Sequence, residues 1–160
     1  MGFLEFFRRS RPPIRDAAGL ADFIDQHSAF LVQKGIYEYS RARAGHYAKV
    51  MFRERGFQQA VEHSRWTAYP LGLAMVGELV EGILRPHAVD RRQQLDALSA
   101  IVLSVFDRYP VPAPLGETAW REARTELARR LQLVGLHPPK RAMDMVVAST
   151  SARPETPASK

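Results

Sequence analysis

The sequence contains no cysteine, and this absence excludes several kinds of site at once. Disulfide bonds, thiolate zinc sites, iron–sulfur clusters and cysteine nucleophiles all need the cysteine sulfur. The chain also lacks the Gly-x-Ser-x-Gly turn of many serine hydrolases and the Glu-x-x-His pairs of di-iron bundles. Its five histidines show no i,i+4 pairing that would place two ligands on one helical face. We therefore assign no catalytic residue, metal ligand or cofactor from the sequence.

Alternating strand patterns and long apolar runs are scarce as well. The most apolar stretch, residues 69–84, would span about 24 Å as a helix, which is shorter than the roughly 30 Å hydrocarbon core of a bilayer. It also contains Glu78 and Glu81, so we interpret it as a buried helix of a globular protein. The first residues lack the uninterrupted apolar run and cleavage site of a secretory signal. We expect a cytoplasmic protein, with a peripheral membrane location as the alternative.

Composition predicts one globular domain with extensions at both ends. The hydrophobic fraction of 46% is ordinary for a folded protein, and 160 residues suffice for a single core. We divide the chain into a basic, aromatic N-terminal arm (1–15), a helical bundle domain (16–148) and a disordered tail (149–160) rich in Ser, Thr, Pro and Ala. The net charge of +6 favours anionic partners and does not distinguish lipid from nucleic acid.

Apolar residues recur at helical spacing along the central domain, which predicts an all-α bundle of four to five helices. The first segment is long for one globular helix, so Gly35 or Gly45 is expected to bend or interrupt it, and Gly56 to close it. Whether it forms one helix or two stays open. Asp16 and Asp90 are placed to cap helices. The predicted helical segments are 16–55, 57–85, 90–109, 115–135 and a short one at 141–147.

Charged side chains interrupt the apolar faces of the first two predicted helices. Charges in such surroundings need a partner or a wet cleft. Glu78 and Glu81 share a helical face and could meet Arg41 or His46 if the two helices are antiparallel. These four residues are our candidate polar pocket for a small ligand or a hydrolytic reaction. The alternative is a structural ion network or a solvated stripe.

Aromatic residues at helical spacing on the same two segments are candidates to line such a pocket. Buried core is the commoner place for aromatic side chains with this spacing, and we interpret them as core. The residues concerned are Tyr37, Tyr39, Tyr47, Trp66 and Tyr69.

The N-terminal arm combines aromatic and basic residues. Aromatics that enter a bilayer interface beside arginines that meet anionic head groups are typical of a short membrane-surface anchor. The alternative is that the phenylalanines fold back onto the bundle or dock on a partner. The candidate contact residues are Phe3, Phe6, Phe7, Arg8, Arg9 and Arg11.

Several short stretches of the first two helical segments resemble a family of uncharacterised helical bacterial proteins. The stretches include Ala29-Phe-Leu-Val-Gln-Lys34, Arg65-Trp66 and Leu84-Arg85-Pro86, and the resemblance covers about half the chain. It implies a bacterial, cytoplasmic, all-helical protein. Some relatives carry an esterase label, but the resemblance assigns no site residue here.

Together these features favour a non-enzymatic interaction or scaffold domain that docks on a protein partner, with an anionic membrane surface as a further contact. A ligand-binding or hydrolytic protein using the polar pocket is the alternative. A weak electrostatic nucleic-acid binder ranks third, because no dense basic face or helix-turn-helix stands out. The sequence predicts neither the oligomeric state nor the identity of the partner.

Overall fold

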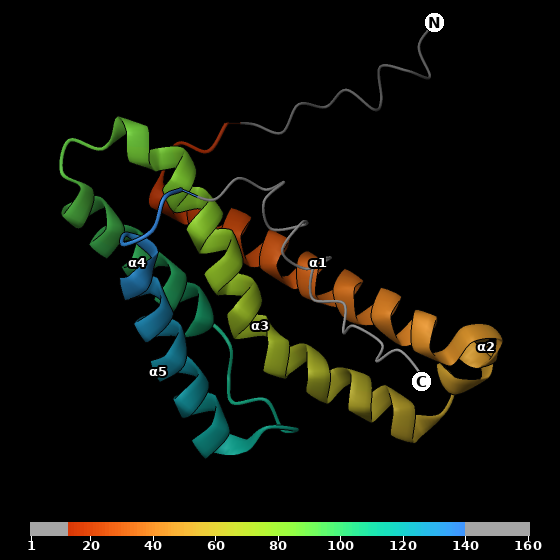
Figure 1. Cartoon of the computed structure of the whole chain (residues 1–160). Helices are drawn as coiled ribbons and strands as arrows, with labels where there is room; N and C mark the ends of the chain where they lie inside the picture. Colours follow the sequence, from red (N-terminus) through yellow and green to blue (C-terminus); the bar gives the residue numbers. More distant parts are fainter. Residues whose placement is uncertain (1–12, 140–160) are drawn as a thin grey trace, which may run out of the picture.

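The computed structural model describes residues 13–139, which form an all-α fold without strands (Figure 1). A turn of 3-10 helix (Gly45–Tyr47) and the short helix α2 (Ala48–Met51) follow the first long helix, and a second 3-10 turn (Arg85–His87) follows the next. The predicted fold class is confirmed; the predicted helix at 141–147 and the tail lie outside the described residues. The long helices are α1 (Ala17–Ala44), α3 (Arg55–Leu84), α4 (Arg91–Phe106) and α5 (Gly116–Val134).

Local signals set several of the helix ends. Asp16 and Asp90 cap α1 and α4 by accepting hydrogen bonds from backbone amides of the first turn, as predicted. The helix α1 ends at Gly45, whose φ of 56° lies in the left-handed region that favours glycine. The first segment is therefore interrupted at Gly45, and α1 runs on through Gly35. Gly56 does not close the segment, because it lies in the first turn of α3.

The helices α1 and α3 form an antiparallel hairpin, and α4 and α5 lie along only one half of it (Figure 1). Because α1 and α3 have 28 and 30 residues while α4 and α5 have 16 and 19, the shorter pair cannot cover the full hairpin. The core sits in the covered half, where Ile24, Leu73 and Val102 are fully buried. Residues 29–68 contain no buried residue at all. Within this stretch, Ala29 and Trp66 still pack against the core cluster, and His63 meets the segment between α4 and α5. We call the rest of the stretch, which no other long helix among residues 13–139 reaches, the distal hairpin.

The most apolar helix of the bundle is also long enough to cross a membrane. It is the helical stretch Arg55–His87, and half of its apolar window is buried inside the fold. The buried part includes Tyr69, Leu73, Val76 and Val80, which belong to the common core. Packing against α1, α4 and α5 therefore accounts for the buried half of this apolar window.

Candidate functional site

The four residues predicted to share a polar pocket lie at opposite ends of the α1–α3 hairpin. Arg41 is exposed near the end of α1 and pairs with Glu38 of the same helix at 3.6 Å. His46 is exposed in the following turn. Glu78 and Glu81 lie near the end of α3, about 30 Å away along the hairpin at 1.5 Å per residue. The predicted pocket is therefore wrong, because the antiparallel helices place Arg41 and His46 at one end of the hairpin and the two glutamates near the other end.

Glu81 belongs instead to a structural ion pair, which was the alternative interpretation. Its carboxylate accepts two short hydrogen bonds from Arg85, at 2.7 and 2.8 Å, and the two side chains are only 5% and 12% exposed. The hydrogen bonds that Arg85 donates to the Glu81 carboxylate raise the pKa of Arg85. Arg85 also donates to the carbonyl oxygens of Val134 and His137 at the end of α5. The pair thereby fastens α5 to α3.

The predicted membrane or partner contacts Phe3 to Arg11 lie outside the described residues and stay a prediction. The described chain begins beside an apolar hollow of about 490 Å³ at the start of α1. The hollow is lined by side chains of α1, α3 and α4 as well as by Ile14, which is half-exposed.

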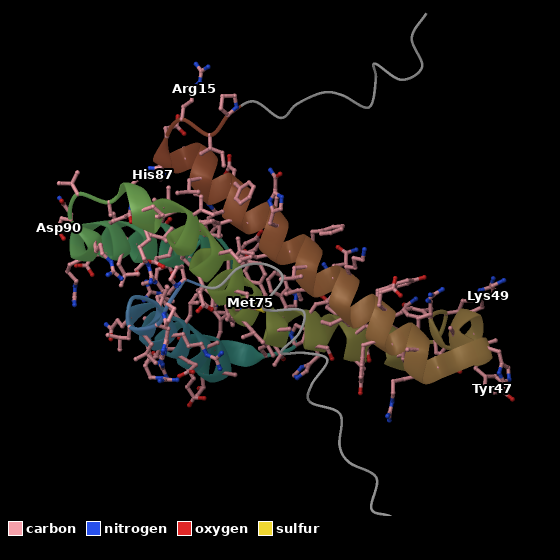
Figure 2. All side chains as sticks on the ribbon, turned by 45° about the horizontal axis from the view of Figure 1, so that its top comes forward. Arg15, Tyr47, Lys49, Met75, His87 and Asp90 are labelled. Carbon is pink, nitrogen blue, oxygen red and sulfur yellow. The ribbon has the colours of Figure 1, made fainter. Side chains whose placement is uncertain are left out.

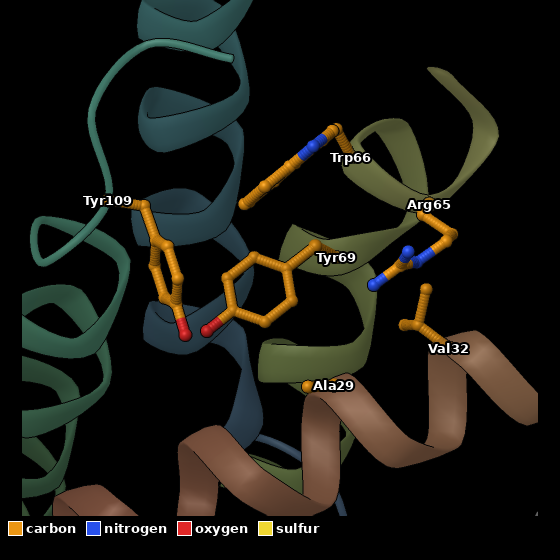
Figure 3. Close-up of a pocket in the computed structure, with 6 residues that line it drawn as sticks. All are labelled: Ala29, Val32, Arg65, Trp66, Tyr69 and Tyr109. Carbon is orange, nitrogen blue, oxygen red and sulfur yellow. The ribbon is translucent and has the colours of Figure 1, made fainter. Parts of the chain in front are cut away.

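A different set of residues converges where the covered half of the hairpin ends. Tyr69 of α3 and Tyr109, which follows α4, both donate hydrogen bonds to Oδ1 of Asp25 in α1, at 2.7 and 2.8 Å. Figure 3 shows the two hydroxyl groups directed toward each other. Arg108 Nη1 lies 3.6 Å from the second oxygen of Asp25. This one carboxylate therefore links three helical segments.

Burial raises the pKa of both tyrosines. Desolvation, followed by the hydrogen bond to Asp25, raises the pKa of Tyr69 far above its ordinary value. The same two causes raise the pKa of Tyr109. Both phenols therefore stay protonated to a higher pH than a free tyrosine would, and they act as hydrogen-bond donors.

These rings form the wall of a hollow, the aromatic hollow, with a volume of about 230 Å³. Trp66 meets Tyr69 and Tyr109 edge to face, at centroid distances of 6.0 and 5.6 Å. Figure 3 shows the guanidinium of Arg65 beside the Tyr69 ring and above Val32. The lining residues are Ala29, Val32, Arg65, Trp66, Tyr69 and Tyr109.

A second hollow of about 360 Å³ shares Arg65 with the aromatic hollow and extends it along the distal hairpin. Lys34 contributes a second cation, 5.9 Å from the centre of the Phe30 ring. We call the two hollows together the groove. Its outer part is lined by Phe30, Gln33, Lys34, Tyr37, Val61 and Arg65.

The predicted aromatic core is only partly confirmed. Tyr69 is buried and Trp66 is partly buried against the core cluster. Tyr37, Tyr39 and Tyr47 are 50%, 66% and 62% exposed, because no helix among residues 13–139 covers this half of the hairpin. Their prediction as core residues is therefore wrong.

Sequence reasoning missed Asp25 and did not single out Tyr109 as a polar partner. The available signal was the position of Asp25, which lies one helical turn after Ala21 and next to Ile24. Both of these apolar residues are buried in the fold. Such a position needs hydrogen-bond donors from neighbouring elements. The donors are 44 and 84 residues away in the sequence, and helical spacing does not identify them.

The groove offers ring faces, aliphatic carbon and two cations as contacts for a bound group. Both tyrosine hydroxyls are already bonded to Asp25. Residues 13–139 hold no group of three or more side chains able to bind a metal ion. No family model, curated protein or solved structure matches this chain. The resemblance noted from the sequence therefore stays a prediction.

Proposed function

We propose that this protein is an interaction domain that holds an acidic, amphipathic helix of a partner protein in the groove. The observation that carries the proposal is the uncovered distal hairpin. Residues 29–68 include no buried residue, yet large apolar side chains such as Phe30 and Tyr37 are 64% and 50% exposed. Contiguous exposed apolar surface of this kind marks interaction sites in folded proteins.

The shape of the hairpin suits a third helix. Two packed helices leave a groove between their ridges, and amphipathic helices bind in such grooves through apolar residues spaced three or four apart. In the covered half this role is filled by α4, α5 and the segment that joins them. That segment reaches α3 at His63, whose Nδ1 lies 3.2 Å from the carbonyl oxygen of Pro114. A partner helix would continue this coverage outward.

The charge of the groove supports an acidic partner. Lys34 and Arg65 line it, and no Asp or Glu does. Neither cation forms an ion pair with a carboxylate among residues 13–139. Arginine binds carboxylates through two parallel hydrogen bonds, so a Glu or Asp of the partner is the group that complements Arg65.

Site-specific photo-crosslinking tests the proposal in the cells that naturally make the protein. A photo-reactive phenylalanine derivative replaces Tyr37 in the groove, and in the control variant it replaces Gln132 on the exposed side of α5. We expect one discrete adduct from position 37 and none from position 132. Sequencing of the crosslinked peptide should identify an acidic, amphipathic segment. The substitution pair Lys34→Glu and Arg65→Glu should abolish the adduct.

Two results would contradict this function. The same adducts from both positions would show that the contact is not specific to the groove. An adduct between two copies of this chain would show that the distal hairpin forms a homodimer instead of binding an acidic partner.

A further inference from the structure

The end of the hairpin that lies furthest from α4 and α5 is basic and carries exposed apolar side chains. Residues 41–55 include five Lys and Arg residues, one histidine, His46, and one acidic residue, Glu54. Arg41 is partly neutralised by Glu38, but the excess of positive charge remains. We define the tip patch as Arg41, Arg43, Tyr47, Lys49, Val50 and Arg53, all of which are exposed.

We propose that the tip patch binds the surface of an anionic lipid bilayer. This contact is separate from the partner groove and does not depend on it.

Position in the fold is the first support. The helix α1 is 28 residues long, or about 42 Å at 1.5 Å per residue. Its distal end projects beyond the bundle, and Figure 2 shows Tyr47 and Lys49 at the extremity of the molecule, far from His87 and Asp90. A flat surface can therefore meet the tip without colliding with α4 or α5.

The side chains at the tip suit the head-group region of a bilayer and the boundary of its acyl chains. Tyr47 and Val50 are 62% and 59% exposed and lie one helical turn apart. Tyrosine favours the head-group level, and an aliphatic side chain gains from entering the boundary of the acyl chains. Each nearby Lys or Arg strengthens binding to an anionic leaflet by about fivefold.

The tip is held in one shape by contacts beneath this surface. The Phe52 ring lies 5.2 Å from Tyr37 and 5.0 Å from Phe57, centre to centre, which ties α2 to both long helices. Gln58 Nε2 donates to the Phe52 carbonyl oxygen at 3.0 Å. A pre-formed tip loses less conformational entropy on binding than an unstructured basic segment would.

The observations favour lipid over nucleic acid. A nucleic-acid backbone offers phosphates to Arg43 and Lys49, but it gives no environment that rewards an outward-facing Val50. The tip is also the narrow end of the two-helix hairpin (Figure 2), whereas electrostatic nucleic-acid binding uses an extended basic face or groove.

Sedimentation of the full chain with vesicles provides the first test. We expect binding to vesicles of phosphatidylcholine mixed with phosphatidylglycerol, release at high salt, and little binding to phosphatidylcholine alone. The variant Arg43→Glu/Lys49→Glu should bind about 25-fold more weakly or worse. The matched control, Arg91→Glu/Arg121→Glu, reverses two exposed charges away from the tip and should change binding less than twofold. Equal binding by the tip variant and the control would overturn the proposal.

A fluorescent probe tests which end of the protein contacts the vesicle. It does not depend on the correct folding of a charge variant. Because the chain has no cysteine, Val50→Cys and Val89→Cys can each be labelled at one site with an environment-sensitive dye. The anionic vesicles should increase the fluorescence at position 50 and leave position 89 unchanged. No increase at position 50, or tip-dependent binding to duplex DNA without binding to vesicles, would contradict a lipid contact. The groove variant Arg65→Glu should still bind the vesicles, so failure of the partner site and failure of the tip contact are distinguishable.

Discussion

Gly72 of α3 packs directly against the backbone of Ser28 in α1. A Cβ added at Gly72 would lie 3.2 Å from the Ser28 carbonyl oxygen and 2.7 Å from Cγ2 of Val32. A β-branched valine in a helix has few other rotamers, so it cannot easily move away. The variant Gly72→Ala should therefore push the two helices apart and lower the free energy of unfolding by about 1–3 kcal/mol, measured by urea denaturation.

Gly35 provides the matched control for this change. It lies within α1, and nothing would contact its added Cβ within 4 Å. Gly35→Ala should stabilise the protein by about 0.5–1 kcal/mol, because alanine has the higher helix propensity. If Gly72→Ala were equally stabilising, the close approach of α1 and α3 would be contradicted.

Ser28 itself gives the second prediction. Its side chain is fully buried, and its hydroxyl oxygen has no hydrogen-bond partner among residues 13–139. A buried polar group without a partner costs free energy that alanine avoids. Ser28→Ala should raise the free energy of unfolding by about 1 kcal/mol.

The exposed Ser104 serves as the comparison for Ser28. Its hydroxyl donates to the Ile101 carbonyl oxygen at 2.7 Å. Substitution of Ser104 by alanine should change stability by less than about 0.5 kcal/mol. A clear loss of stability in Ser28→Ala would indicate that the Ser28 hydroxyl is hydrogen-bonded after all.

The parts of the fold that depend on local chemistry could be predicted from the sequence. Asp16 and Asp90 cap helices through amides only two or three residues away, so their role follows from spacing. The choice between Gly35 and Gly45 as the interruption could not be made, because both cost free energy inside a helix. The turn that reverses the chain after α1 decides in favour of Gly45.

The candidate site could not be predicted because it depends on contacts between distant segments. Asp25 is joined to residues 44 and 84 positions away. The exposure of Tyr37, Tyr39 and Tyr47 follows from how far α4 and α5 reach along the hairpin, which helical periodicity does not reveal. Periodicity identifies the apolar side of a helix but not whether another element covers it.

The third prediction concerns alkaline pH. The pKa values of Tyr69 and Tyr109 are raised in the folded protein by burial and by Asp25. Their contribution to stability is therefore complete below the unfolded pKa of about 10 and is lost as pH rises through the folded values. Above pH 10, and as long as the folded phenol stays protonated, Tyr69 should add up to about 1.4 kcal/mol per pH unit to the fall in the free energy of unfolding, and Tyr109 should act in the same direction.

Substitution of one tyrosine tests this linkage. Above pH 10, the free energy of unfolding of Tyr69→Phe should fall less steeply with pH than that of the unsubstituted protein, because one fewer tyrosine loses a proton on unfolding. At neutral pH the same variant should be less stable by about 1 kcal/mol, because it lacks the hydrogen bond to Asp25. Urea denaturation across the alkaline range measures the slope. The absorbance of tyrosinate can be recorded in the same samples. Part of its increase should occur only when the helical circular dichroism signal is lost, because the buried tyrosines ionise on unfolding. An unchanged slope would contradict the raised pKa of Tyr69.

The final prediction concerns the buried pair Glu81 and Arg85. Glu81→Leu would leave the guanidinium of Arg85 buried without its carboxylate, so the free energy of unfolding should fall by about 3–5 kcal/mol. The double variant Glu81→Leu/Arg85→Met removes both charges and should recover most of this loss. About 1 kcal/mol should stay lost, because Arg85 also donates to carbonyl oxygens at the end of α5.

An exposed pair with the same helical spacing isolates the effect of burial. Arg92 and Asp96 are 3.2 Å apart, and their side chains are 82% and 62% exposed. Asp96→Ala should therefore cost less than about 0.5 kcal/mol in the same urea experiment. If Glu81→Leu were no more costly than Asp96→Ala, the carboxylate of Glu81 would have to be solvated. Arg85 would then hold α5 through the two carbonyl contacts alone, and Arg85→Met should be as disruptive with Glu81 present as without it.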